Sequence, residues 1–287
     1  MSIFGSPLVS TDWLLENIND PHLRIVDASW YLPSFERDPK AEYADAHIPS
    51  AVFFDIDEIA DLDNSLPHML PSPEKFSLRV RKLGLGDGTR IVVYDGDGIS
   101  SAARVWWMFK TFGHDAVAVL DGGLPRWATE GKPVSNMPEN SRERHFTPHF
   151  RARMVRNADD LLAGLNDGKG DQIIDARPAG RFMGTEPEPR KGLRGGHIPG
   201  SFSLPQTSMF DADGLFLRGD VLRQAFIDAG ISLDGSITTS CGSGVMASVI
   251  ALALDLLGHD DVAVFDGSWS EWGARDDVPV HTAADID

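Results

Sequence analysis

The chain has 287 residues, which suits one large or two average domains, and 42% of them are hydrophobic, enough to form buried cores. Its 43 acidic against 26 basic residues give a net charge of −17, which argues against nucleic acid and anionic membranes as partners. A single cysteine excludes an intrachain disulfide and favours a reducing compartment such as the cytoplasm. No apolar run approaches the ~20 residues of a membrane span. We expect no signal peptide, because the segment MSIFGSPLVSTDW lacks its pattern.

Short β-branched runs alternate with amphipathic segments along the chain. We expect strands at 23–28, 51–54, 90–95, 116–120, 172–176, 202–204, 236–240 and 262–265. We expect helices at 10–18, 73–83, 100–112, 157–166, 219–229 and 245–257. Suitable N-caps are Ser10 and Asn157, and helices should stop at Gly84, Gly113, Gly230 and Gly258. Strands that alternate with helices predict α/β domains, each with a mainly parallel central sheet flanked by helices.

Three segments recur in the same order in the two halves of the chain. RIVDASWYLP (24–33) returns as QIIDARPAGR (172–181), DAHIPSAVFFD (45–55) as GGHIPGSFSLP (195–205), and FGHDAVAVLDGGLPRW (112–127) as LGHDDVAVFDGSWSEW (257–272). Such self-similarity indicates two homologous domains. We place them at 1–135 and 155–287, joined by a polar, proline-containing linker at 136–154.

The only cysteine lies in TTSCGSGVMAS (238–248), between a strand-like run and a helix that is apolar nearly all round. Gly242 and Gly244 allow the loop to curl so that several N–H groups point inward and form an anion nest. The dipole of the helix adds positive potential at the same point. A thiolate of Cys241 would be stabilised there, and such a sulfur is a nucleophile.

Two other interpretations of Cys241 remain open at this stage. A lone cysteine is often a small buried hydrophobic residue, but the equivalent loop of the first half has Asp95 at this position, as expected if only one half does chemistry. A phosphatase-type loop needs an arginine six positions after the cysteine, where this sequence has Ala247. We therefore favour a nucleophile that does not act on phosphate.

The motifs HIPSA and HIPGS, LDGG and FDGS, and the loop that starts at the cysteine resemble the two-domain rhodanese-like sulfurtransferases over nearly the whole chain. DASWYLP, RVWWMF, GTEPEPR and CGSGVMA resemble the 3-mercaptopyruvate sulfurtransferase branch of that family. The resemblance implies two tandem rhodanese-like domains, of which the second is catalytic. The loop of that branch usually ends in threonine, and Met246 replaces it here with the loss of a hydroxyl.

The donor substrate is suggested by charge. Thiosulfate-using members of the family typically carry basic residues just after the cysteine, whereas no cation follows Cys241 here. A monoanionic keto acid instead needs a carboxylate clamp, which arginine supplies through bidentate pairing. By resemblance, Arg181 and Arg190 hold the carboxylate and the carbonyl oxygen of 3-mercaptopyruvate. The alternative is that they only form surface ion pairs with Glu186 or Glu188.

The resemblance also implies a two-step reaction. The Cys241 thiolate takes the sulfur of 3-mercaptopyruvate as a persulfide and releases pyruvate, while the amides of Gly242, Gly244 and Val245 bind the reacting groups. A thiol acceptor, either a small thiol or a thioredoxin-like protein, or cyanide then removes the outer sulfur.

Proton transfer in this scheme is assigned by resemblance to Ser243, supported by His47 and Asp38 from the first half. His47 has a repeat partner, His197, so an anchoring role in the turn before a strand is the alternative for this residue. We expect neither a metal nor an organic cofactor. Two other functions stay open: a thiosulfate sulfurtransferase, and a non-catalytic rhodanese-like binding module.

Overall fold

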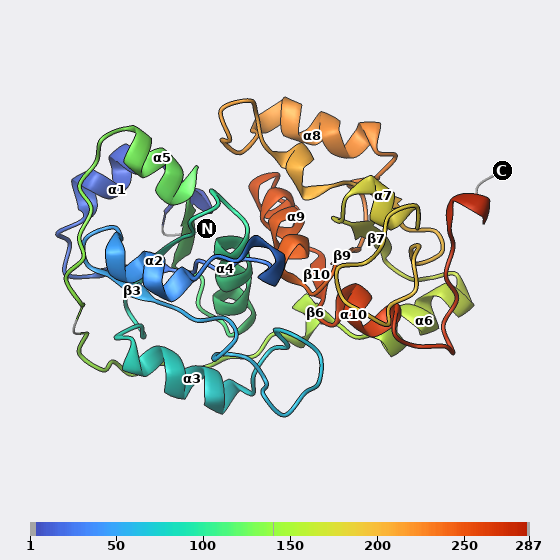
Figure 1. The fold of residues 1–287 in the computed structure, drawn as a ribbon, viewed down its shortest axis with the longest axis horizontal. Helices are drawn as coiled ribbons and strands as arrows, with labels where there is room; N and C mark the ends of the chain where they lie inside the picture. The colour runs from blue at the N-terminus through green and yellow to red at the C-terminus, as the bar shows by residue number, and fades with distance from the viewer. Residues whose placement is uncertain (1–3, 140, 286–287) are drawn as a thin grey trace. The chain divides into compact units, whose positions relative to one another are not determined.

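The computed structural model describes residues 4–139 and 141–285 (Figure 1). The chain divides into two compact units. The first comprises the described residues up to Leu62, together with Leu70–Arg151 and Ala212–Phe216. The second comprises Asp63–Met69, Ala152–Asp211 and the described residues from Leu217 onward.

The first unit is built on a five-stranded parallel sheet with the strand order β1-β5-β4-β2-β3. Its strands are β1 (Leu8–Val9), β2 (Leu23–Asp27), β3 (Ala51–Phe53), β4 (Arg90–Tyr94) and β5 (Val117–Leu120). Its helices are α1 (Thr11–Asn17), α2 (Pro39–Asp45), α3 (Pro73–Lys82), α4 (Ser101–Thr111) and α5 (Gly123–Thr129). A 3-10 turn covers Pro33–Phe35, and α4 packs against β4 and β5.

The second unit repeats this plan with the strand order β6-β10-β9-β7-β8, again all parallel. Its strands are β6 (Val155–Arg156), β7 (Gln172–Asp175), β8 (Phe202–Ser203), β9 (Ile237–Ser240) and β10 (Val262–Phe265). Its helices are α6 (Ala158–Asp167), α7 (Ala179–Phe182), α8 (Gly219–Asp228), α9 (Val245–Leu256) and α10 (Ser268–Trp272). Three 3-10 turns cover Ala152–Met154, Gln206–Met209 and Ala283–Asp285.

The strands and long helices expected from the sequence are confirmed to within two residues at each end. The Ser10 hydroxyl accepts from the Trp13 amide at 3.1 Å, and Asn157 forms a capping box with Asp160, so both N-caps are confirmed. The four glycines expected at helix ends all have left-handed φ angles, between 70° and 90°. The two-residue strands β1 and β6 and the short helices α2, α5, α7 and α10 were missed, because segments this short show no periodicity.

Each unit has its own apolar core. In the first, Leu14, Ile25, Val92 and Trp127 belong to one buried cluster; in the second, Phe265, Trp269 and Trp272 do. Almost every residue of α4 and most residues of α9 are buried, which confirms that the apolar helix after the cysteine lies in the interior.

The polar segment 136–154 has little regular structure where the structure describes it. Residues 149–151 follow the first unit closely, because the amides of His149 and Arg151 donate to the carbonyls of Phe112 and Thr111, each at 2.8 Å. Among the described residues, no helix is long and apolar enough to cross a lipid bilayer.

Candidate active site

Cys241 lies directly after β9 and four positions before the first residue of α9, at the carboxyl edge of the second parallel sheet. This edge is where parallel α/β sheets commonly bind ligands. The exposed fraction of Cys241 is 1% and that of Ser243 is 5%. Burial of this degree fits a structural cysteine as well as a nucleophile, so the surroundings of the loop must distinguish the two.

The side chain of Ser268 holds the cysteine loop through hydrogen bonds to its backbone. The amides of Cys241 and Gly244 both donate to the Ser268 hydroxyl at 3.1 Å, and this hydroxyl donates to the Phe265 carbonyl at 2.7 Å. Ser268 is fully buried and has a φ of 49°, in the left-handed region that disfavours residues with a Cβ. The loop is thus fixed by a residue in a strained backbone conformation.

The start of α10 also binds the loop carbonyls. The Trp269 amide donates to the Cys241 carbonyl at 2.9 Å, and the Ser270 amide and hydroxyl donate to the Gly242 carbonyl at 2.9 and 2.6 Å. These bonds direct the loop carbonyls to α10. Among the residues that the structure describes, no protein group accepts from the N–H of Gly242, Ser243 or Val245.

The expected anion nest is therefore smaller than the sequence suggested, because two of its amides are taken by Ser268. The two glycines of the loop are needed for different reasons. Gly244 has a φ of 79° and makes the turn into α9, as expected. Gly242 has no positive φ, and a Cβ there would lie 3.1 Å from Nη2 of Arg181 and 3.6 Å from Nη1 of Arg190. Its lack of a side chain leaves room for two guanidinium groups.

The two arginines expected from the sequence thus meet over the cysteine loop. Arg181 lies in α7 and is 9% exposed, and Arg190 lies in the irregular segment that follows. Nη2 of Arg190 also donates to the Ser243 hydroxyl at 3.4 Å. Two cations above a loop with open amides form a site for an anionic ligand.

A buried carboxylate holds one of these arginines. The side chain of Glu188 is 2% exposed and accepts from Nη2 of Arg181 at 2.6 Å and from Nη1 of Arg177 at 2.8 Å. The alternative expectation, a surface ion pair with Glu186 or Glu188, named a correct partner for Arg181, but the Arg181–Glu188 pair is buried and holds Arg181 beside the loop. Glu186 is exposed.

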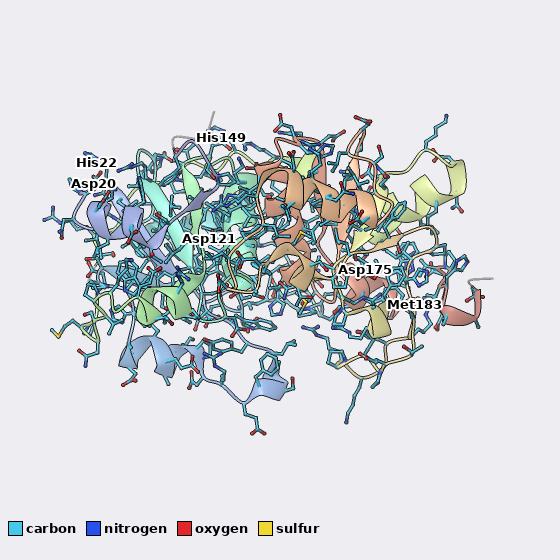
Figure 2. All side chains as sticks on the ribbon, turned by 90° about the horizontal axis from the view of Figure 1, so that it is seen from above. Asp20, His22, Asp121, His149, Asp175 and Met183 are labelled. Carbon is cyan, nitrogen blue, oxygen red and sulfur yellow. The ribbon has the colours of Figure 1, made fainter. Side chains whose placement is uncertain are left out.

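Arg177 anchors this group to the sheet. Its guanidinium is fully buried, binds Asp175 at the end of β7 (labelled in Figure 2) at 2.6 Å, and lies 4.2 Å from the centre of the Trp269 ring. Burial alone would lower the pKa of Arg177, but the Asp175 and Glu188 carboxylates outweigh it and raise the pKa above its ordinary value.

The equivalent loop of the first unit has its amides bound to a carboxylate side chain. Asp95 follows β4 as Cys241 follows β9, and its carboxylate accepts from the amides of Asp97, Ser100 and Ala102 at 3.0, 2.7 and 2.8 Å. Burial raises the pKa of Asp95, although these three amides act in the opposite direction. In this loop of the first unit, the amides therefore bind a carboxylate that the loop itself supplies.

His47 and Asp38 belong to the first unit, and the structure gives each a structural partner there. Nδ1 of His47 lies 2.7 Å from the Tyr43 carbonyl and its ring stacks on Tyr43, while His197 makes the same two contacts with Phe182. Because a carbonyl only accepts, Nδ1 of His47 carries the hydrogen and Nε2 is the nitrogen that can exchange a proton. Asp38 is exposed and caps α2 through the amides of Lys40 and Ala41.

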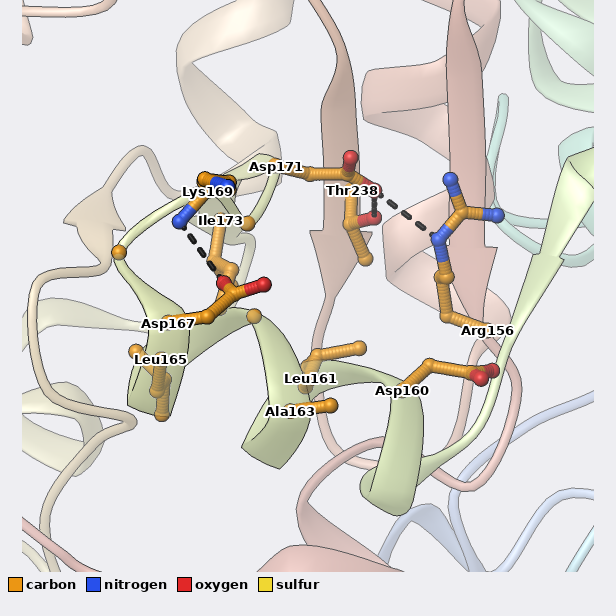
Figure 3. Close-up of a pocket in the computed structure, with 13 residues that line it drawn as sticks. Arg156, Asp160, Leu161, Ala163, Leu165, Asp167, Lys169, Asp171, Ile173 and Thr238 are labelled. Atoms are coloured by element: carbon orange, nitrogen blue, oxygen red, sulfur yellow. Dashed lines mark hydrogen bonds and ion pairs between the residues drawn. The ribbon is translucent and has the colours of Figure 1, made fainter.

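A separate cavity of about 390 Å³ lies in the second unit beside α6 (Figure 3). Arg156 and Thr238 both donate to Asp171 there, at 3.0 and 2.5 Å. Asp171 precedes β7, so this cavity lies at the amino edge of the sheet, away from Cys241. Within the described part of the chain, no group of three or more His, Cys, Asp or Glu side chains is placed to hold a metal ion.

Comparison with known proteins agrees with the duplicated architecture. The Rhodanese-like domain profile matches residues 10–130 and again residues 157–275. The chain belongs to the rhodanese family. Each of the two sheets thus lies at the centre of one rhodanese domain. The cysteine loop, the convergent arginines and Glu188 lie in the second domain.

Several relatives of this chain are named sulfurtransferases. The structure of SseA from Escherichia coli, described as a 3-mercaptopyruvate sulfotransferase, matches with a TM-score of 0.84 at 40% identity, over 93% of this chain and all of that one. Thiosulfate/3-mercaptopyruvate sulfurtransferase 1 of Arabidopsis thaliana, mitochondrial, is 44% identical over 97% of this chain and 79% of its own length. Thiosulfate sulfurtransferase of Rattus norvegicus is 42% identical over 93% of this chain and 92% of its own.

Two residues of this rhodanese site were missed from the sequence. The sequence repeat could have indicated Ser268, since it aligns this residue with Gly123. A serine in place of a glycine at a turn suggests that the serine hydroxyl is needed. Glu188 was named only as an alternative partner, because its segment has no counterpart in the first half and nothing in the sequence shows that the carboxylate is buried.

Proposed function

We propose that this sulfurtransferase uses 3-mercaptopyruvate as its sulfur donor and Cys241 as its nucleophile. The observation that carries the proposal is the convergence of Arg181 and Arg190 on Gly242, in a loop that has no cation of its own. This arrangement can hold the carboxylate and the carbonyl oxygen of a keto acid while the sulfur reaches the cysteine.

In the first step, the Cys241 thiolate attacks the sulfur of 3-mercaptopyruvate. An S–S bond forms, the C–S bond breaks, and its electron pair leaves on the carbon of the pyruvate enolate. The proton of the substrate thiol is transferred to that carbon, so pyruvate leaves and a persulfide anion stays on the enzyme. Negative charge develops on the enolate oxygen, where the two arginines stabilise it.

The loop supplies the other contacts. The amides of Gly242 and Val245, together with that of Ser243, bind the persulfide anion, while Gly244 sets the turn that aims them. The Ser243 hydroxyl, which already accepts from Arg190, relays the proton between sulfur and carbon.

We further propose that His47 and Asp38 support this proton transfer, with Nε2 of His47 as the exchanging nitrogen. The contacts of His47 match those of His197, so geometry within the first unit does not favour the catalytic role over the anchoring one. His47→Gln separates them: a catalytic role requires a fall in kcat together with a changed pH profile, whereas an anchoring role requires a lower melting temperature.

In the second step, a thiol removes the outer sulfur of the persulfide. We propose a small thiol or a thioredoxin-like protein as the acceptor, with cyanide as an effective substitute in assays. We also propose a reducing compartment, the cytoplasm, because the single cysteine must stay reduced to react.

Thiosulfate is the second candidate donor, because a relative named thiosulfate sulfurtransferase is as similar overall as the others. Overall identity therefore does not distinguish the donors, and the loop favours the keto acid: thiosulfate carries two negative charges, and residues 242–246 include no basic residue. A non-catalytic module is favoured only by the 1% exposure of the cysteine.

Mass spectrometry after incubation with 3-mercaptopyruvate tests the proposal. We expect one added sulfur on the peptide that contains Cys241, with one equivalent of pyruvate released, and none in Cys241→Ser. Steady-state rates with both donors then decide between them, and a higher kcat/KM for thiosulfate would refute the assignment. A chain that acquires no sulfur from either donor would be a binding module.

A further inference from the structure

Another cavity, of about 550 Å³, lies in the first unit and is lined mainly by the segment 18–25 and by residues that follow position 138. Three of its lining residues are arginines: Arg24, Arg142 and Arg144. We infer that this cavity binds a small molecule through a phosphate group. The inference is independent of Cys241 and of the sulfur donor, since every lining residue belongs to the first unit.

The first step of the argument is that the positive charge of this cavity is not neutralised by the protein. Within the part of the chain that the structure describes, none of the three arginines forms an ion pair. Asp20 (labelled in Figure 2) also lines the cavity, but it accepts from Nη2 of Arg90 at 2.5 Å and from the His22 amide at 2.7 Å. The remaining carboxylate of the described lining is that of Glu139, which is exposed. Three guanidinium groups are thus opposed by one carboxylate that is not already bound to a cation.

The second step concerns repulsion between the arginines. Arg24 is half-buried, and its Nη1 donates to two backbone carbonyls at 3.0 and 2.6 Å, which holds the guanidinium in place. Burial lowers the pKa of Arg24, and the Arg144 guanidinium lowers it further, against the opposite effects of Glu139 and Asp20. A bound anion would offset this repulsion, so the empty cavity stores an electrostatic preference for negative charge.

The third step is that the backbone carrying Arg142 and Arg144 is fixed without a ligand. A Cβ at Gly84 would lie 2.9 Å from the carbonyl oxygen of Arg142, and a Cβ at Gly86 would lie 2.8 Å from Cβ of Arg144. The two glycines therefore allow this segment to approach the end of α3 closely. The Arg144 amide also donates to the Arg81 carbonyl at 3.2 Å. Because the backbone is already anchored, a ligand has to order only the arginine side chains, which reduces the entropy cost of binding.

The chemistry of the lining indicates the class of ligand. Guanidinium groups pair bidentately with phosphate and carboxylate oxygens, but a phosphate monoester carries about −1.5 to −2 charges at pH 7 and can contact several arginines at once. A cavity of this volume is typical of small-molecule sites and leaves room for an organic part beside the phosphate. The net charge of −17 opposes a long polyanion such as nucleic acid, whose other phosphates would be repelled by the rest of the chain.

Isothermal titration calorimetry with AMP, inorganic phosphate and adenosine tests the inference. We expect at least one of the two phosphate compounds to bind, and adenosine to bind at least about tenfold more weakly than AMP. Tighter binding of AMP than of phosphate identifies an organic phosphate as the ligand, and any other order identifies free phosphate. If neither phosphate compound binds at millimolar concentration, or if adenosine binds as tightly as AMP, the inference is wrong. An RNA oligonucleotide that binds more tightly than both would also overturn it.

Two variants with opposite expected effects then locate the binding. Arg144→Gln should weaken binding of the tighter phosphate compound about tenfold, the factor expected for the loss of one charge-assisted hydrogen bond. Glu139→Gln should strengthen it about threefold, because it removes the opposing carboxylate at an exposed position. Loss of structure cannot produce the second effect, so the pair separates a binding role of these charges from a role in folding.

Matched controls remove the same charges elsewhere. Arg223→Gln changes an exposed arginine of α8 in the second unit, and Glu143→Gln changes an exposed glutamate that pairs with Arg81 at 3.0 Å and does not line the cavity. Both should bind the phosphate compound within about twofold of wild type. An Arg144→Gln variant with wild-type affinity, or a Glu139→Gln variant that binds more weakly, would overturn the inference. If Arg144→Gln yields no folded protein, the increase expected for Glu139→Gln decides.

Discussion

Replacement of Ser268 by alanine removes the hydroxyl that holds the cysteine loop. In the folded protein this hydroxyl accepts from the amides of Cys241 and Gly244 and donates to the Phe265 carbonyl. Ser268→Ala keeps the Cβ and hence the strain of the φ of 49°, so the variant isolates the loss of the three hydrogen bonds.

The magnitude follows from burial. Ser268 is fully buried, and a buried polar group left without a partner costs roughly 1–3 kcal/mol. Two amides and one carbonyl lose their partner together, and partial relaxation of the loop offsets part of the loss, so we expect about 2–4 kcal/mol. For a domain of this size that corresponds to a fall in melting temperature of roughly 5–15 °C. Ser268→Gly, which also relieves the left-handed strain, should lose less.

The reactivity of the sole thiol provides the functional assay. Because the chain has one cysteine, every alkylated thiol is that of Cys241. If the clamp aims the loop amides, the alkylation rate at neutral pH and kcat should change together in Ser268→Ala. Ser201→Ala, which removes a hydroxyl that donates to the Ile198 carbonyl at 2.6 Å, is the control. A Ser268→Ala variant with the melting temperature, alkylation rate and kcat of wild type would refute the reasoning.

Three further predictions use simpler changes. Cys241→Ser should lower sulfur transfer to cyanide at least about a thousandfold because oxygen forms no persulfide, and unchanged turnover would mean that the thiol is structural. Arg181→Ala should raise KM for 3-mercaptopyruvate at least about tenfold and affect thiosulfate less, so equal losses for both donors would count against a carboxylate clamp. Asp95→Asn tests the loop of the first unit. Burial raises the pKa of Asp95 in the folded state above 3.8, so its ionised form destabilises the fold near neutrality. This penalty decreases as the pH falls below the folded-state pKa and vanishes near the unfolded-state value. The melting temperature of Asp95→Asn minus that of wild type should therefore be most positive near pH 7 and decrease toward pH 4, and a difference that increases toward pH 4 would contradict the burial argument.

The duplicated fold was predictable because its signals are local or repeated. The apolar runs of β4 and β9 and the apolar surface of α9 identify buried elements by composition alone. The short helices α7 and α10 were not predictable, since their stability comes from packing and hydrogen bonds that join distant segments. Those helices carry Arg181 and Ser268, so the sequence identified the arginine only through a family motif.

The site was predictable where a residue type is itself informative. Cys241 stands out because it is the only cysteine and lies between a strand and a buried helix, and the two arginines stand out through a family motif. Glu188 does not stand out, because its importance depends on burial. Gly242 was predicted for the wrong reason: its role is room for Arg181, which only coordinates reveal.

The loop between β4 and α4 has six residues, two more than the loop between β9 and α9. A Cβ on Gly123, which is aligned with Ser268, would lie 2.4 Å from the Gly98 carbonyl oxygen, so the longer loop occupies the space of the missing hydroxyl. Anyone who wishes to engineer a second sulfur carrier into this chain must therefore shorten that loop before introducing the serine, and only then exchange Asp95 for a cysteine.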